Sequence, residues 1–120
     1  MIVCIVFIMV ITIVEERILV MVKHIILWKI KEEKTEEEKA EIKANVKKGL
    51  EGLQGQIPGL LSIHVQTDSL ASSTADLMLN SSFESEEALK NYAVHPAHVA
   101  VANSAVRPNM EVRMCLDFEE

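Results

Sequence analysis

Two histidines and one tyrosine are the residues of this chain best suited to proton transfer. His24 lies within an apolar run, and Tyr92 shortly precedes His98. An imidazole titrates near neutral pH, so it can take a proton from a carbon atom or return one. A phenol beside it can hydrogen-bond the imidazole or a substrate oxygen. Together these residues favour acid–base chemistry, such as the enolisation of a β-keto compound.

Each of these histidines also has a purely structural interpretation. His24 fits a core histidine that is satisfied by one hydrogen bond, and His98 fits a helix-start residue packed against a sheet. His95 is expected to mark a helix break and to bond a free backbone carbonyl there. His95 and His98 are spaced to touch one metal ion, but no carboxylate stands beside them. We therefore expect no metal.

Composition excludes several classes of protein. The chain has 120 residues, which suits one domain, and 18 acidic against 12 basic residues give a net charge of −6. Nucleic-acid binding is not expected, because phosphate contacts need clustered Lys and Arg. Cys4 and Cys115 cannot build a disulfide framework, and no base is evident beside Cys115. These features predict a reduced, cytoplasmic domain without nucleic-acid partners.

The first fourteen residues, MIVCIVFIMVITIV, are almost entirely apolar. A membrane span needs roughly 20 residues, so this run is short for one. It could be a membrane anchor of marginal length, an extra strand, or translated leader sequence. The leader interpretation rests on Glu15-Glu16-Arg17, which can be encoded by a purine-rich run. Bacterial ribosomes bind such a run shortly before a start codon, which here would be that of Met21. We favour the leader, so residues 1–20 are expected to lie outside a domain spanning 21–120. A membrane partner is expected only if residues 1–20 belong to the protein.

Apolar periodicity predicts the elements that position the histidines. Residues 22–30 alternate as a strand, which places His24 on the same face as four apolar residues, Val22, Ile26, Trp28 and Ile30. Thr35 and Glu38 form a capping box that starts a helix. The remaining pattern predicts a helix end near Gly52 to Gly55, strands 61–67 and 75–83, a helix from Ser85 broken at Pro96, a helical segment 97–105 and a strand 112–118.

The resulting order, β-α-β-β-α-β, is typical of the α+β class with a ferredoxin-like arrangement. One antiparallel four-stranded sheet would carry both helices on a single face. The other face would also carry apolar groups, among them Ile25 and Leu27. A monomer would expose this patch to water, so we expect a homodimer that pairs two sheets face to face.

Two stretches, VKHIILWKIK (22–31) and FESEEALKNYAVHPAHVAV (83–101), resemble those of the stress-responsive A/B barrel (Dabb) family. The resemblance implies a ferredoxin-like domain whose dimer forms an α/β barrel. One plant member closes a linear tetraketide thioester by aldol condensation without a cofactor. Its pocket histidines and tyrosine correspond to His24, Tyr92 and His98, whereas a further pocket tyrosine falls at Val46, so that part of its site is absent.

These observations lead to two hypotheses. In the first, the homodimer binds a small apolar or polyketide-like molecule and acts as a cofactor-free lyase or cyclase. His98 would remove an α-proton while Tyr92 and His24 hold the oxygens, and four further residues would line the pocket: Ile26, Trp28, Val46 and His95. In the alternative, the chain is a non-catalytic, stress-related structural dimer. The sequence leaves open whether it is an enzyme.

Overall fold

The structure, a computed structural model, describes residues 20–120. The predicted extension 1–20 therefore lies, except for Val20, outside the described residues. The elements follow in this order: β1 (Val22–Ile30), α2 (Glu36–Glu51), β2 (Leu60–Gln66), β3 (Leu77–Phe83), α3 (Glu86–Val94), α4 (Pro96–Val101), the π-helical turn η1 (Ala102–Val106), the 3-10 turn η2 (Arg107–Asn109) and β4 (Met110–Glu119).

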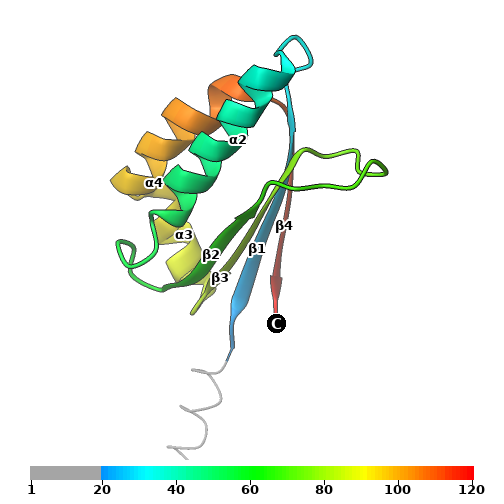
Figure 1. Cartoon of the computed structure of the whole chain (residues 1–120). Helices are drawn as coiled ribbons and strands as arrows, with labels where there is room; N and C mark the ends of the chain where they lie inside the picture. The colour runs from blue at the N-terminus through cyan, green and yellow to red at the C-terminus, as the bar shows by residue number, and fades with distance from the viewer. Residues whose placement is uncertain (1–19) are drawn as a thin grey trace, which may run out of the picture.

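The four strands form one sheet in the order β2-β3-β1-β4. Each neighbouring pair is antiparallel. The helices α2, α3 and α4 all lie on one face of this sheet, and the opposite face carries no helix among residues 20–120 (Figure 1). The predicted ferredoxin-like α+β fold is confirmed. No helix of the described residues is long and apolar enough to cross a membrane.

Local signals in the sequence account for the helix starts. The Thr35 hydroxyl accepts from the Glu38 N–H at 3.1 Å, and the Glu38 carboxylate accepts from the Thr35 N–H at 2.9 Å. This capping box satisfies two backbone donors that the first turn of α2 would otherwise leave free. Ser85 caps α3 by accepting from the Ala88 N–H at 3.0 Å. Both helix starts were predicted.

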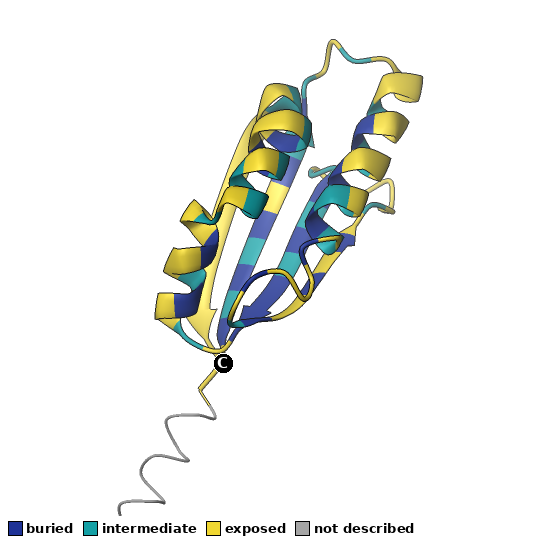
Figure 2. Ribbon diagram, turned by 90° about the vertical axis from the view of Figure 1, so that its left-hand side faces the viewer, coloured by how far each residue is buried: buried dark blue, intermediate teal, exposed yellow. Residues whose placement is uncertain are grey.

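The hydrophobic core fills the space between the sheet and the helices. The alternate residues of β1 face it, and Trp28 is 3% exposed. From the helix side, α2 contributes a stripe of fully or almost fully buried residues, namely Ile42, Val46 and Leu50. Figure 2 shows this pattern as buried bands along the middle of the sheet, beneath helices that are exposed on their outer surfaces.

Strand β4 presents its apolar side away from the helices. Its register pairs Asp117 with His24 and Cys115 with Ile26. Directly opposite residues share one face of a sheet, so the polar residues of β4 face the helices. The predicted apolar alternation is real, but its members lie on the uncovered face, where they are exposed: Val112, Met114, Leu116 and Phe118.

The element boundaries differ from the prediction at four places. The second strand, β2, begins and ends one residue earlier than predicted. The third strand begins at Leu77, not Ala75, because Asp76 caps the neighbouring strand by accepting from the Ile30 N–H at 2.8 Å. The predicted helical segment 97–105 divides into α4 and the π-helical turn η1. The last strand is longer than predicted and runs from Met110 to Glu119.

Candidate functional site

A cavity of about 310 Å³ lies between the helix-facing side of the sheet and the helices α3 and α4. Apolar side chains from the sheet and helices form most of its wall, and polar side chains come from β1, α3, α4 and β4. Five of the seven residues predicted for the site line this one cavity: His24, Ile26, Trp28, Tyr92 and His98.

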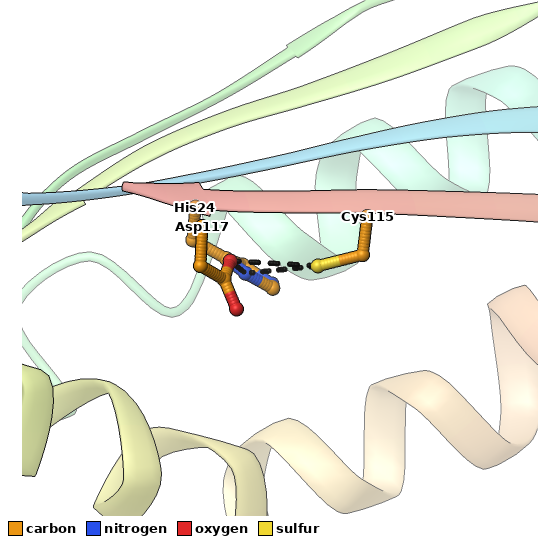
Figure 3. Close-up of side chains that lie close together, drawn as sticks. All are labelled: His24, Cys115 and Asp117. Carbon is orange, nitrogen blue, oxygen red and sulfur yellow. Dashed lines mark hydrogen bonds and ion pairs between the residues drawn. The ribbon is translucent and has the colours of Figure 1, made fainter. Parts of the chain in front are cut away.

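His24 is held from two neighbouring strands. Its ring is buried, and its Nδ1 hydrogen-bonds the Oδ1 atom of Asp117 on β4 (Figure 3). Its backbone carbonyl accepts from the Ser81 hydroxyl of β3 at 2.9 Å. With the Nδ1 proton directed to a carboxylate, the neutral ring keeps Nε2 as its free acceptor. The Asp117 carboxylate also stabilises the imidazolium that forms when Nε2 takes a proton.

Cys115 lies beside this pair on β4. Its Sγ atom is 3.4 Å from Asp117 Oδ1 and 3.7 Å from His24 Nδ1. Sequence analysis found no base near Cys115, and that prediction was wrong, because the base comes from a strand far away in the sequence. Burial and the neighbouring Asp117 nevertheless raise the pKa of the Cys115 thiol. It is therefore protonated at neutral pH and poorly suited to act as a nucleophile.

The group of His24, Cys115 and Asp117 is the set of side chains among residues 20–120 with the composition of a metal site. Their ligand atoms lie within 4.8 Å of one another. His24 Nδ1 and Asp117 Oδ1 are hydrogen-bonded to each other, so in this structure the two groups serve as each other's partners.

Tyr92 places an unused hydrogen-bonding group in the cavity wall. The residue is 1% exposed, and its ring packs against Phe83 and His98 with centroid separations of 4.9 and 4.2 Å. Its hydroxyl has no hydrogen-bond partner among the described residues. Burial raises the pKa of the Tyr92 phenol far above its usual range, so the group remains a donor. A buried polar group without a partner costs about 1–3 kcal/mol, which a ligand oxygen would recover.

His98, on α4, is half-buried beside the Tyr92 ring. Its Nδ1–H donates to the Ala93 carbonyl at 3.3 Å, which leaves Nε2 as an acceptor. Burial lowers the pKa of His98 below 6.5, and the positive charges of Arg107 and Arg113 contribute. The ring is therefore neutral at pH 7, and no carboxylate of residues 20–120 pairs with it to stabilise its protonated form.

The lowered pKa of His98 predicts how stability depends on pH. The unfolded chain protonates this ring near pH 6.5, while the folded state resists protonation, so the unfolded state binds more protons below about pH 7. The free energy of unfolding should therefore fall as the pH drops from 6.5 toward the folded pKa. Urea denaturation of His98→Gln should show a shallower fall than the wild type. His64→Gln is the control, because His64 is exposed. If His98→Gln and His64→Gln showed the same dependence of unfolding free energy on pH, His98 would not be the group responsible.

The groups that face His98 come from every element around it. They are His24 on β1, Tyr92 on α3, Arg107 on η2 and Arg113 on β4. Because all four remain in His98→Gln, the difference in slope between the two proteins isolates the His98 ring itself.

Two residues predicted to line the pocket do not line this cavity. Val46 is fully buried in α2 and packs in the core. His95 stands between α3 and α4, where its Nδ1 accepts from the Ala97 N–H at 3.1 Å. The expected helix break is present, but the His95 ring caps the start of α4 and does not bond a free carbonyl. A capping geometry directs the ring toward the backbone instead of the cavity.

Two further polar residues of the site were not predicted from the sequence: Arg113, which lines the cavity, and Asp117, which bonds His24. Both lie on the helix-facing side of β4, opposite His24 and Trp28 respectively. The sequence of β4 does contain a signal for these two residues, because apolar residues occupy its even-numbered positions from 112 to 118 and Arg113 and Asp117 lie at odd-numbered ones. Only the strand register places them beside the histidine, and that register is not encoded in a local pattern.

The Dabb family profile, described as "Stress responsive A/B Barrel Domain", matches residues 22–120. A dimeric ferredoxin-like protein of unknown function from Bacteroides fragilis is 33% identical, with a TM-score of 0.79 over 83% of this chain and 96% of that chain. A protein from Arabidopsis thaliana is 25% identical, with a TM-score of 0.63 over 82% and 94%. The hydroxynitrile lyase from Passiflora edulis is similar in fold alone, at 19% identity and a TM-score of 0.64 over 83% and 93%.

The family predicted from the sequence motifs is confirmed by these comparisons. A search of the curated proteins finds no match. The closer correspondence with the plant cyclase site is not confirmed and stays a prediction. With its profile matched from residue 22 to residue 120 and its ferredoxin-like sheet in place, the chain belongs to the stress-responsive A/B barrel domain (Dabb) family.

Proposed function

We propose that this chain forms a homodimer that binds a small, largely apolar molecule in the cavity and transforms it by proton transfer. The class of reaction is that of a cofactor-independent lyase or cyclase acting on a β-keto or polyketide-like substrate. The observation that carries the proposal is the buried, unpartnered hydroxyl of Tyr92 in the same cavity wall as the His24–Asp117 pair.

In this proposal, His24 is the base. His24 has the carboxylate partner that stabilises an imidazolium, whereas burial and two arginines disfavour protonation of His98. The role of base, predicted for His98 from the family resemblance, therefore moves to His24. His98 instead packs on the Tyr92 ring and offers Nε2 to a hydroxyl of the ligand.

The proposed reaction moves only protons and electron pairs. His24 Nε2 takes a proton from a carbon between two carbonyls, and the electron pair of the broken C–H bond moves to form an enolate. The Tyr92 hydroxyl donates to the enolate oxygen, where negative charge develops. The enolate carbon then attacks a further carbonyl of the same molecule, one that does not flank it, and the resulting alkoxide recovers the proton from His24. Every proton and electron pair is accounted for within the substrate and His24, so the reaction needs no cofactor.

Replacement of Tyr92 by phenylalanine tests the binding part of the proposal. The variant removes a buried hydroxyl without a partner, so the ligand-free protein should keep or gain stability, by up to about 1–3 kcal/mol. Its affinity for acetoacetyl-N-acetylcysteamine, a β-keto thioester, should fall about 5- to 30-fold, measured by calorimetry. Unchanged affinity in a stable variant would contradict a ligand contact at Tyr92.

The uncovered face of the sheet supports the dimer in both hypotheses. Met114 and Leu116 are 65% and 63% exposed on β4, and Leu27 on β1 is 40% exposed. They lie on the face that carries no helix (Figure 1). The similar protein from Bacteroides fragilis is described as dimeric. A non-catalytic structural dimer would use the same face, but its cavity would bind nothing.

Leu116→Lys should convert the dimer to a monomer. An unpaired charge in an apolar interface costs several kcal/mol, and each 1.4 kcal/mol changes the dissociation constant tenfold. The dimer dissociation constant should rise about 100-fold or more, measured by analytical ultracentrifugation. Leu70→Lys is the matched control, since Leu70 is 80% exposed on the loop after β2. A dimer that survives Leu116→Lys would place the interface elsewhere.

A further inference from the structure

Arg113 lies where two hollows of the surface meet. It lines the cavity of about 310 Å³, and it also lines a neighbouring cleft of about 540 Å³ between α3 and β4. Its place opposite Trp28 in the strand register puts it on the helix-facing side of β4. His24 lines the same two hollows, so the arginine and the histidine border one junction.

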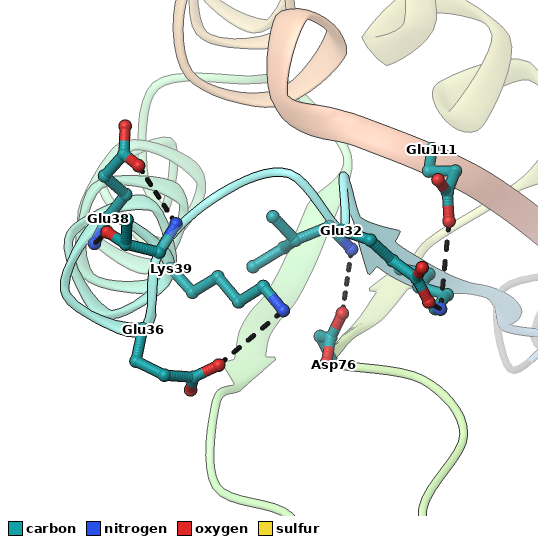
Figure 4. A network of polar contacts seen from close by, with 9 residues as sticks. Glu32, Glu36, Glu38, Lys39, Asp76 and Glu111 are labelled. Atoms are coloured by element: carbon teal, nitrogen blue, oxygen red, sulfur yellow. Dashed lines mark hydrogen bonds and ion pairs between the residues drawn. The ribbon is translucent and has the colours of Figure 1, made fainter.

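Two carboxylates near the cavity already have partners on other side chains. Asp117 bonds His24, and the Glu111 carboxylate lies 3.8 Å from the Lys29 ammonium (Figure 4). Arg113, in contrast, forms no ion pair with any residue between 20 and 120. The cavity wall thus carries an exposed guanidinium that forms no ion pair with a carboxylate of residues 20–120 and is free to bind a ligand.

A second guanidinium adds to this positive charge. Arg107 lines the same cavity and donates to the Asn103 side chain, a neutral acceptor. It too has no ion pair within the described part of the chain. The charges of Arg107 and Arg113 both reach the His98 ring, where they oppose its protonation. Two cations without an ion pair among residues 20–120 therefore line one cavity of a chain whose net charge is −6.

We propose that the β-keto or polyketide-like molecule bound in this cavity also carries a carboxylate, which Arg113 holds while the apolar body lies against the cavity wall. The inference rests on the proposed small-molecule site and names its substrate class. A guanidinium binds a carboxylate through two parallel N–H···O bonds, which gives both affinity and orientation. An acid held at Arg113 lies beside the His24–Asp117 pair, so Arg113 determines which molecules reach the base in a productive orientation.

A matched pair of ligands tests this inference by calorimetry on the full chain. The probes are 4-pentylbenzoate and its neutral amide, 4-pentylbenzamide, which differ in charge but hardly in shape. The wild type should bind the acid more tightly than the amide. Arg113→Gln should weaken binding of the acid about 10- to 100-fold and leave binding of the amide within about twofold. Lys48→Gln is the control, because it removes the same charge from an exposed site that lines neither hollow.

The outcomes separate this inference from the proposed function. If the wild type binds acid and amide equally, or if Arg113→Gln weakens both equally, the cavity binds small molecules but Arg113 does not select acids. If Lys48→Gln weakens the acid as much as Arg113→Gln does, the effect is one of overall charge, and the inference is overturned. If neither probe binds the wild type, the proposed small-molecule site fails and the inference fails with it.

Discussion

Replacing His24 by glutamine should lower the turnover of a poly-β-keto thioester, which carries a further carbonyl for the enolate to attack, about 100- to 10,000-fold, the range that a positioned general base contributes. The glutamine keeps a polar group at the site but cannot take the proton from carbon. Asp117→Asn should lower turnover as well, because the imidazolium loses its negatively charged partner and an amide replaces the carboxylate that accepts from Nδ1–H. Turnover is measured spectrophotometrically by loss of the enolisable thioester at pH 7.

The double variant His24→Gln/Asp117→Asn gives a sharper test of the pair. If Asp117 acts only through His24, the double variant loses no more turnover than His24→Gln alone. His64→Gln is the matched control, since His64 is exposed on β2, outside both hollows. Full turnover in His24→Gln, together with a large loss in His98→Gln, would return the role of base to His98.

Much of the fold could be predicted because its signals are local. The alternation of 22–30 defines β1, the Thr35–Glu38 capping box starts α2, and Ser85 caps α3. Each of these features depends on residues within a few positions of one another. The element order then leaves few topologies, because antiparallel neighbours and short connections are strongly preferred.

The site could be predicted only in part because its decisive contact is not local. His24 and Asp117 are 93 positions apart and meet through the register between β1 and β4. A shift by one residue would reverse the face on which every side chain of β4 lies. For His95 the sequence predicted a bond to a free backbone carbonyl, whereas the ring accepts from the Ala97 N–H two residues later in the chain.

Strand β4 links the proposed dimer to the proposed chemistry. One side of the strand carries Leu116 and its apolar neighbours on the uncovered face. The other side carries Arg113, which lines the cavity, and Asp117, which lines the neighbouring cleft and holds His24. Within the sheet of residues 20–120, β4 is an edge strand whose one neighbour is β1. In the proposed dimer, packing of the apolar side would hold this edge in place and so fix the position of Asp117 relative to His24. Weakening the dimer should therefore also weaken turnover.

Gly59→Ala should destabilise the protein by about 2–5 kcal/mol, the largest stability effect that we expect from a single added methyl group. Gly59 has a φ of 81°, a conformation that costs a residue with a Cβ about 1–2 kcal/mol. A Cβ built there would lie 2.5 Å from the Cβ of Ala88 on α3. Overpacking of this kind costs a further 1–3 kcal/mol or so, because the Ala88 Cβ is fixed to the helix backbone.

Gly55→Ala is the matched control for this prediction. Gly55 has a similar φ of 84°, but a Cβ there would meet nothing within 4 Å, so only the backbone cost of about 1–2 kcal/mol remains. Guanidinium denaturation of both variants at one protein concentration isolates the contact with α3 as the difference between them. Equal destabilisation of the two variants would show that α3 shifts away from the added methyl group without a further loss of stability. Since Tyr92 follows Ala88 by one turn of α3, the clash at Gly59 should also weaken binding of the β-keto thioester, whereas Gly55→Ala should leave that affinity unchanged.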